Sequence, residues 1–156
     1  MKQITPALLD QLGQQAQQSP RRRANHNLHP ALNDPIQRLA IAMEPDTYVR
    51  PHRHPHTWEL LTPLRGRFLV LYFDDSGTVT ERTVLGEDCA MLENPAGQWH
   101  AVLSLDVGGV IFEVKHGPYQ AIAEADYLPG SPAEGDALAT TLAWYAQAQV
   151  GDPLPT

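Results

Sequence analysis

Short apolar segments separated by turn-forming residues dominate the middle of the chain. The run Phe68–Phe73 is apolar throughout, as in a strand buried on both faces, and Asp75-Ser76-Gly77 after it is a turn signal. Gly, Pro, Asn and Asp bound the other runs, which is typical of strands joined by short connections. The pattern predicts about eight strands, over residues 38–43, 48–54, 59–64, 67–74, 78–85, 89–92, 98–104 and 110–115. That number and spacing of strands favour a mainly β fold, a jelly-roll β-barrel.

Each end of the chain carries a helical pattern instead. Thr5-Pro6 joins a capping residue to a proline suited to the first helical position, and an apolar stripe follows at Leu8, Leu9, Leu12 and Ala16. Residues 20–36 are rich in prolyl breaks, so we expect an extended loop there. The segment Ser131-Pro132-Ala133-Glu134 matches a capping box before a helix whose apolar face carries Leu138, Leu142 and Tyr145. We therefore expect one domain in three parts: an N-terminal helix and extended arm (1–36), the barrel (37–120) and a C-terminal helical extension (121–156).

The composition narrows the class of protein. A chain of 156 residues, 42% of them apolar, is long enough for one domain around a sizeable core. Its formal net charge of −7 argues against binding to nucleic acid or to an anionic membrane. The single cysteine, Cys89, cannot form an internal disulfide, which fits a reducing compartment. Since the sequence shows neither an apolar leader nor a run long enough to span a bilayer, we expect a cytoplasmic protein.

Four side chains suited to a metal ion recur at defined spacings. His52 and His54 are two residues apart, which places them on one face of a strand, and Glu59 follows a proline break that lets the chain turn back. His100 comes directly after a Pro-x-Gly turn signal. Three neutral imidazoles and one carboxylate form a ligand set for a divalent transition metal such as Fe(II), Mn(II), Ni(II) or Zn(II). The alternative interpretation is a surface loop rich in histidine, with unrelated Glu and His residues elsewhere.

The same residues resemble the two motifs of the cupin superfamily. His52-x-His54, four residues, Glu59, six residues and Gly66 match the core of the first motif, and Pro95-x-Gly97-x-x-His100 matches the second. In cupins these positions bind one metal ion inside a small β-barrel, so the resemblance implies a single ion held by His52, His54, Glu59 and His100. Three turn or barrel-edge positions depart from the pattern, because Asp46, Cys89 and Ser104 stand where the motifs have Gly, Gly and Asn.

A narrower resemblance is to the WbuC-type cupin metalloproteins. The segments that suggest it are Ser19–His29, Lys115–Tyr119 and the final helical stretch, residues 128–149. These proteins are often linked to surface-polysaccharide gene clusters, so the resemblance implies a small polar, sugar-derived substrate. It does not supply a reaction.

Other polar residues are candidates for substrate binding. Parity places Tyr48 and Arg50 on the face of His52, and Gln98 on the face of His100. Arg50 would then either hold a substrate carboxylate or phosphate inside the barrel or form a structural ion pair. The same parity leaves His56 as either an additional ligand or a solvated turn residue.

The run Arg21-Arg22-Arg23 also has two interpretations. It is either a solvated basic patch or, because the WbuC resemblance places this segment near the barrel mouth, part of an anion-binding lid. In the second case Arg23, Asn25 and His26 would contact the substrate. By parity, Trp58 and Trp99 point away from the metal and pack in the core.

Two classes of function follow from these observations. The first is a metal-dependent enzyme of the isomerase, epimerase or dioxygenase type, because four protein ligands leave open positions on an octahedral ion for a small polar or anionic metabolite. The second is a non-catalytic, metal-dependent domain that binds or senses a small molecule. In both cases exposed sheet edges favour a homodimer.

Overall fold

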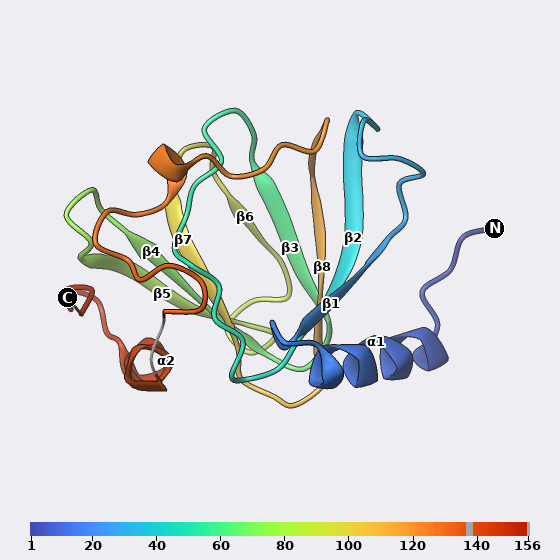
Figure 1. Ribbon diagram of the computed structural model, residues 1–156, viewed down its shortest axis with the longest axis horizontal. Coiled ribbons are helices and arrows are strands. Elements are labelled where there is room, and N and C mark those ends of the chain that lie inside the picture. The colour runs from blue at the N-terminus through green and yellow to red at the C-terminus, as the bar shows by residue number, and fades with distance from the viewer. Residues whose placement is uncertain (137–138, 156) are drawn as a thin grey trace.

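Two antiparallel sheets form the body of the computed structural model, which describes residues 1–136 and 139–155. The larger sheet has the strand order β1-β2-β8-β3-β6, and the smaller sheet has the order β5-β4-β7 (Figure 1). The strands are β1 (Arg23–Asn27), β2 (Ile36–Met43), β3 (Glu59–Arg65), β4 (Phe68–Phe73), β5 (Val79–Leu85), β6 (Leu92–Asn94), β7 (Trp99–Ser104) and β8 (Gly109–His116). The helices are α1 (Pro6–Gln18), α2 (Ala139–Gln147) and a short 3-10 turn, η1 (Glu124–Asp126).

Apolar side chains fill the space between the two sheets. One buried cluster joins the larger sheet to the smaller through Met43, Leu61, Phe68, Val70, Val102 and Ile111. Alternate residues of β4 and β7 face the other way and pack in a second cluster with Tyr145 of α2, as Leu69 and Trp99 do. The strand β4 is therefore buried on both faces, as its uninterrupted apolar sequence predicted.

The prediction of a closed barrel is wrong in one respect. Within the described residues, no ladder of paired strands joins the two sheets, so they face one another without closing. The segment predicted as a strand over residues 48–54 makes only isolated bridges, from His52 to His100 and to Tyr127. Pro45, Pro51 and Pro55 explain this, because proline cannot donate a ladder hydrogen bond.

The N-terminal helix forms as its sequence predicted. The Thr5 side chain accepts a hydrogen bond from the Leu8 backbone N–H at 3.2 Å, and Pro6 is the first helical residue. Leu12 and Ala16 of α1 are buried against Ala40, Ala42 and Val110. These three residues lie on β2 and β8, so α1 covers the outer face of the larger sheet and leaves the inner face for the site (Figure 1).

Three local predictions differ from the structure. Residues 23–27 were expected in a loop, but they form β1, which pairs along its whole length with β2. The strand expected over residues 89–92 is β6, which begins at Leu92. Residues 131–136 do not open a helix, because the Ser131 hydroxyl donates to the Leu128 carbonyl at 2.6 Å; α2 is described from Ala139. Leu138 lies outside the described residues.

None of the described helices is long and apolar enough to cross a membrane.

Candidate metal centre

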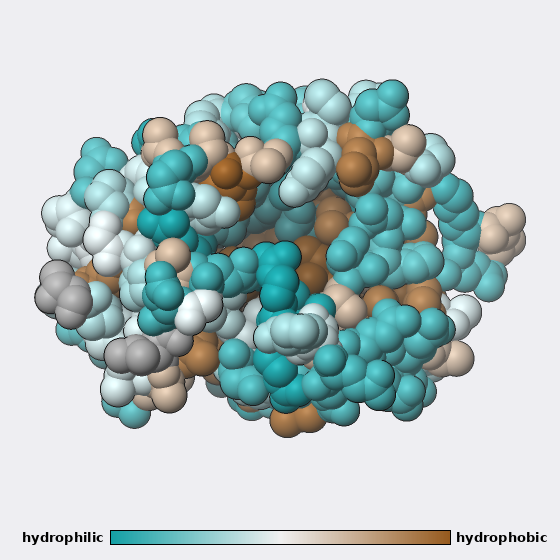
Figure 2. All heavy atoms as spheres, in the orientation of Figure 1, coloured by the Kyte–Doolittle hydropathy of each residue, from teal (hydrophilic) through white to brown (hydrophobic). Residues whose placement is uncertain are grey.

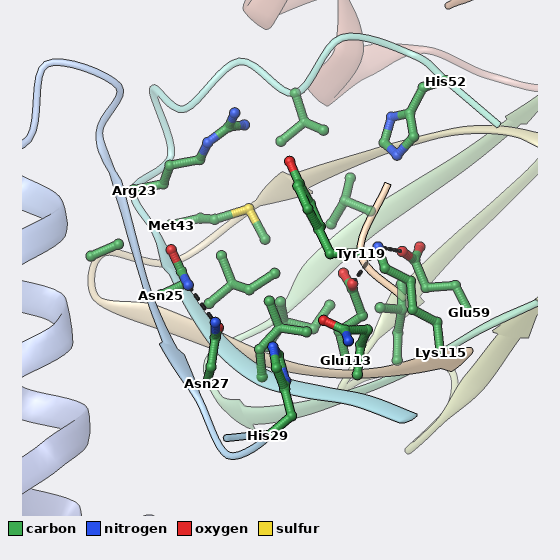
Figure 3. A pocket seen from close by; sticks show the side chains of 18 of the residues that line it. Arg23, Asn25, Asn27, His29, Met43, His52, Glu59, Glu113, Lys115 and Tyr119 are labelled. Atoms are coloured by element: carbon green, nitrogen blue, oxygen red, sulfur yellow. Dashed lines mark hydrogen bonds and ion pairs between the residues drawn. The ribbon is translucent and has the colours of Figure 1, made fainter. Parts of the chain in front are cut away.

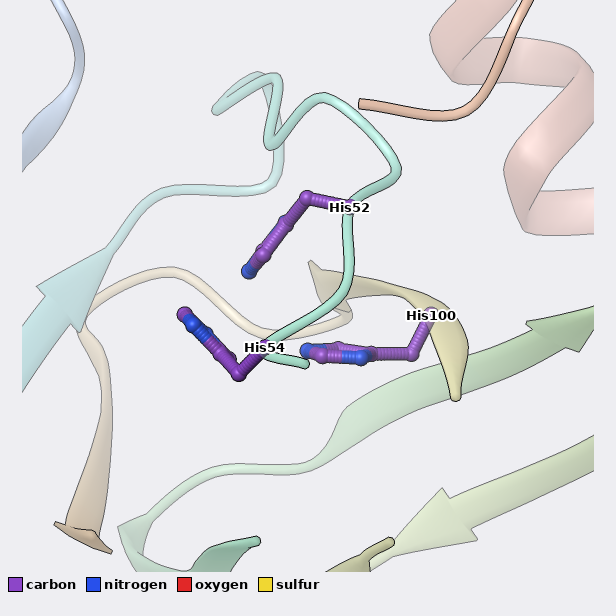
Figure 4. A group of neighbouring side chains, drawn as sticks. All are labelled: His52, His54 and His100. Carbon is purple, nitrogen blue, oxygen red and sulfur yellow. The ribbon is translucent and has the colours of Figure 1, made fainter. Parts of the chain in front are cut away.

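Three histidines converge in the space between the sheets (Figure 4). His52 and His54 come from the irregular segment before β3, and His100 is the second residue of β7. Their ligand nitrogens all lie within 4.8 Å of one another, and the three residues are 8%, 8% and 1% exposed. The backbone brings the two motifs together, because His52 and His100 exchange N–H···O hydrogen bonds of 3.0 and 2.9 Å.

Backbone carbonyls fix the orientation of two of the rings. Nδ1 of His52 lies 2.8 Å from the Arg50 carbonyl, and Nδ1 of His100 lies 3.0 Å from the Gln98 carbonyl. A carbonyl can only accept, so each Nδ1 carries the proton in the neutral ring and each Nε2 keeps its lone pair. Such a contact is the usual way in which a protein orients a metal-binding histidine.

The inward nitrogens lack hydrogen-bond partners. Nε2 of His54 and Nε2 of His100 are both buried, and neither makes a hydrogen bond of acceptable geometry within the described residues. Leaving a buried polar atom unpaired costs about 1–3 kcal/mol. A divalent ion bound to these lone pairs would remove that cost, so the donor set fits a metal.

Glu59, at the first position of β3, lies beside two of these histidines. Its Oε1 lies 3.3 Å from Nε2 of His54, and its Oε2 lies 3.1 Å from Nε2 of His100. Two donor atoms bound at right angles to one ion at roughly 2.1 Å would be about 3.0 Å apart. The carboxylate is therefore close enough to His54 and His100 to share an ion with these two residues.

Polar neighbours hold this carboxylate in place. Lys115 Nζ lies 3.2 Å from Oε1, and Asn94 Nδ2 donates to Oε2 at 3.0 Å. The Tyr72 hydroxyl in turn donates to Asn94 Oδ1 at 2.8 Å. Asn94 and Lys115 lie directly opposite Glu59 in the ladders of β3 with β6 and with β8, so the sheet itself sets these contacts.

The protonation states suit cation binding. Burial and the neighbouring His100 lower the pKa of His52 to about 3, which keeps this imidazole neutral. Burial alone would raise the pKa of Glu59, but the interactions with His100, His54 and Lys115 outweigh burial and lower it well below the usual range. The same Glu59 contact outweighs burial at His100 and raises its pKa. Glu59 is thus ionised and His52 neutral, whereas the raised pKa of His100 favours its charged form, from which a bound metal ion would displace the proton.

A cavity of about 490 Å³ opens beside His52 and His100, and Glu59 also lines it. Its apolar wall comes from β2 and neighbouring strands, including Leu39, Ile41, Met43 and Ile111. Its polar groups come mainly from β1 and β8, namely Arg23, Asn25, Asn27, Glu113 and Lys115 (Figure 3). The space-filling view shows the molecule hollowed on this face, with a largely hydrophilic rim (Figure 2).

Of the other residues predicted to bind substrate, the structure brings three to this region. Arg23 and Asn25 line the cavity, and Arg50 lines its mouth together with His52 and His54. Arg50 is itself paired, since its Nε donates to Ser131 at 2.9 Å and its guanidinium lies 3.1 Å from Glu124 and 4.4 Å from the centre of the Tyr127 ring.

Three further candidates lie elsewhere, and their proposed roles are corrected. Tyr48 is buried in the outer core, where it stacks on Tyr145. The Gln98 side chain donates to the backbone carbonyls of Phe73 and Trp99. His26 alternates with Asn25 and Asn27 along β1, so it faces away from the cavity.

The predictions for His56, Trp58 and Trp99 also have mixed outcomes. His56 is exposed in a turn, which fits the solvated interpretation. Trp99 packs in the outer core as predicted, whereas Trp58 is half-buried and meets the His116 ring edge-on.

Two residues of the site were missed. Glu113 and Lys115 alternate on β8 and both face the cavity, where Lys115 Nζ lies 2.6 Å from Glu113 Oε1. Burial and the nearby Glu59 charge raise the pKa of Glu113 to about 7. The sequence could have indicated them, because they are two charged residues at alternate positions in an otherwise apolar strand. Both lie on the face of that strand that turns toward His100.

Comparisons with known proteins agree with this architecture. The family model described as "Domain of unknown function (DUF6016)" matches residues 4–85. No curated protein matches the chain. Among solved structures, similar folds include KdgF from Halomonas sp. (TM-score 0.51, 13% identity, covering 65% of this chain and 84% of that one) and the TT1209 protein from Thermus thermophilus (0.54, 18%, 74% and 97%).

An oxalate oxidase in complex with the substrate analogue glycolate is also similar (TM-score 0.53, 18% identity, covering 84% of this chain and 68% of that one). These neighbours include cupin-fold proteins, and identities this low show a shared fold alone. The chain therefore has a cupin-like fold, and its three-histidine group can hold a metal ion.

Proposed function

Because the chain belongs to the DUF6016 family and has a cupin-like fold, we propose that it is a metal-dependent enzyme acting on a small polar, anionic metabolite. The observation that carries this proposal is the buried convergence of His52, His54 and His100 at one end of a cavity. A purely structural zinc site is typically tetrahedral and rich in thiolates, unlike this set of imidazoles.

The ion would be held by Nε2 of the three histidines and by Glu59. Fe(II), Mn(II), Ni(II) and Zn(II) all suit a ligand set of nitrogen and oxygen without sulfur. When bound, such an ion supplies a Lewis acid, or a centre for dioxygen chemistry if it is Fe(II).

The chain's own residues provide the rest of the chemistry. The Glu113 carboxyl can accept or return a proton at the cavity wall, and Lys115 joins it to Glu59. The apolar wall excludes water from the ligand, which strengthens polar interactions near the ion. A group that takes and returns a proton beside a bound ion supports an isomerase or epimerase; an oxygenase is the other reaction type that the ligand set supports.

The alternative function is a non-catalytic domain that binds or senses a small molecule. It is favoured by one observation, namely that the charged groups around the ligand histidines are already paired. Arg50 contacts Glu124, and Lys115 contacts both Glu59 and Glu113. A binding protein needs no free acid or base, whereas an enzyme must release one of these pairs during turnover.

The finer parts of the proposal concern substrate and assembly. The WbuC resemblance favours a sugar-derived metabolite, in line with a link to surface-polysaccharide biosynthesis, and we also propose a cytoplasmic homodimer. A dimer would double the mass measured by light scattering, and a monomer at every concentration would remove this part of the proposal.

The experiment that tests the function uses protein purified without chelators and loaded separately with each of the four ions. Small polyhydroxy acids and sugar acids are screened for binding by calorimetry, and each ligand found is then followed by NMR with and without air. Conversion of a bound compound by one loaded form supports the enzyme. Binding without conversion in all four forms supports the binding domain.

A further inference from the structure

Arg21 and Arg23 both contact the carboxylate of Glu134 at the mouth of the cavity. Arg21 Nε and its terminal NH2 donate to Glu134 Oε1 and Oε2 at 3.3 and 2.6 Å. Arg23 approaches Glu134 Oε1 at 2.7 Å. Arg23 is the first residue of β1 and Arg21 lies two residues before it, whereas Glu134 lies more than a hundred residues later, in the segment before α2.

This contact lies beside the proposed metal ligands. Arg21, Arg23 and Glu134 all line the mouth of the cavity together with His52 and His54. Arg21 and Arg23 also line the deeper cavity that reaches His100, whereas Glu134 does not. Figure 3 shows Arg23 and His52 on opposite sides of Tyr119, and all three residues line the same cavity.

The geometry is that of carboxylate recognition. A guanidinium binds a planar carboxylate through two parallel N–H···O bonds, and Arg21 already binds Glu134 in this way. The side chain of Glu134 thus shows what kind of group the two arginines are placed to hold.

A carboxylate on a ligand could take the place of the Glu134 side chain between Arg21 and Arg23. The side chains of Arg21, Arg23 and Glu134 are 58%, 23% and 39% exposed, and ion pairs at this exposure contribute little because water and salt screen them. Two arginines against one glutamate also leave one positive charge uncompensated. A carboxylate on a ligand already anchored at the ion has a high effective concentration here, so it can displace Glu134.

We infer that Arg21 and Arg23 form a carboxylate-binding subsite for the ligand, and that Glu134 occupies this subsite in the free protein. The inference rests on the proposed function, because it assigns the second anchoring point of the same ligand. The ligand would carry a metal-binding group at one end and a carboxylate at the other.

A matched pair of sugar acids tests the subsite. Gluconate and glucarate both carry a carboxylate beside a hydroxyl that can bind a metal, and they differ in the far end, which is a hydroxymethyl group in gluconate and a carboxylate in glucarate. Their affinities for Zn(II)-loaded protein are measured by calorimetry for the natural chain and for variants whose fold is checked by circular dichroism.

The variants should move the glucarate affinity in opposite directions. Loss of a charge-assisted hydrogen bond in Arg23→Gln or Arg21→Gln should weaken glucarate by about tenfold. Removal of the competing charge in Glu134→Gln should strengthen glucarate by about threefold. Gluconate should change little in either case. Arg22→Gln is the matched control, because Arg22 pairs with Asp46 outside the cavity and should leave both affinities unchanged.

Two results would overturn the subsite. One is an unchanged ratio of glucarate to gluconate affinity in both Arg23→Gln and Glu134→Gln. The other is the absence of glucarate binding by Zn(II)-loaded Glu134→Gln at millimolar concentration. Metal uptake is measured separately on the same samples, so the subsite can fail while the metal centre stands, and a chain that takes up no Zn(II) overturns the metal-based function as well.

Discussion

The metal centre and the cavity mouth hold their polar groups in different ways. His52, His54, Glu59 and His100 are all at least nine-tenths buried, and backbone carbonyls or sheet neighbours orient most of them. The mouth uses ion pairs in which at least one partner is well exposed, such as Arg50 with Glu124 and Arg21 with Glu134. From this difference we infer two roles. The buried residues hold the metal-binding groups in one geometry, and the exposed ion pairs can rearrange when a ligand binds.

The largest expected effect comes from removing a buried ligand. His100→Ala should lower metal affinity by more than about 100-fold, since loss of a direct ligand should exceed the 10–100-fold typical of groups that only orient one. Metal content per chain after dialysis measures this, with circular dichroism to show that the sheets persist.

His56→Ala is the control for that experiment. His56 is exposed in the adjacent turn, so its loss should leave metal content unchanged. Equal metal loss in both variants would mean that the histidine-rich segment binds ions without a defined centre.

The next effect concerns stability against pH in the metal-free protein. The pKa of His52 is about 3 in the fold and about 6.5 when the chain is unfolded, so the unfolded chain binds the extra proton between these values. The contribution of His52 to stability should therefore fall as the pH drops from about 6.5 toward 3, by on the order of a few kcal/mol. The raised pKa of His100 acts oppositely, but its contribution is complete below pH 6.5. The pKa of Glu113, raised to about 7, also acts oppositely, so Glu113 offsets the loss at His52 between about pH 7 and 4.5. Below about pH 4.5 the loss at Glu59 adds to the loss at His52, so the net fall in stability is expected there.

Urea unfolding at several pH values measures this dependence. His52→Gln should make the free energy of unfolding rise more as the pH drops from 6.5 to 4.5, and fall less steeply below 4.5, because no imidazole at position 52 is then kept neutral by burial. An equally steep fall in the variant would show that other groups control the acid sensitivity.

A smaller effect should follow from loosening Glu59 without touching a ligand. Asn94→Ala removes the donor to Glu59 Oε2 and should weaken metal binding by roughly tenfold. Tyr72→Phe removes only the hydroxyl that holds Asn94, so its effect should be smaller still. Competition with a metal-sensitive dye gives both values, and the reverse order would mean that Asn94 does not position the carboxylate.

The smallest effect is expected at the mouth. Arg50→Ala should weaken anionic ligands by about threefold, because Arg50 is partly neutralised by Glu124, and should leave metal content intact. Calorimetry with an anionic and a neutral ligand of the same size measures this. Weaker binding of the neutral ligand to the same extent would show that Arg50 acts through Ser131 and Tyr127 on the shape of the mouth instead.

The sequence predicted secondary structure best where local helix or strand signals agree with the burial of the segment. Thr5 and Pro6 start α1 because capping is a local property, and β4 forms over Phe68–Phe73 because both of its faces are buried. The spacing of the four candidate ligands could likewise be recognised, because their approach depends on one turn before Glu59 and one before His100.

The prediction that alternate residues share one face was wrong where the chain does not form a regular strand. Pro51 interrupts the segment from Tyr48 to His54, so Tyr48 packs against Tyr145 rather than sharing the face of His52. The sequence did not predict the strand β1, because its residues, Arg-Ala-Asn-His-Asn, do not alternate between apolar and polar. It forms by backbone pairing with β2, which depends on the tertiary fold.

X-ray absorption at the metal edge of the stoichiometrically loaded chain tests the central claim most directly. We expect only nitrogen and oxygen neighbours at about 2.0–2.2 Å, with the outer scattering of three imidazoles, and two in His100→Ala. A sulfur neighbour, or an unchanged imidazole signal in His100→Ala, would contradict a centre built from His52, His54, Glu59 and His100.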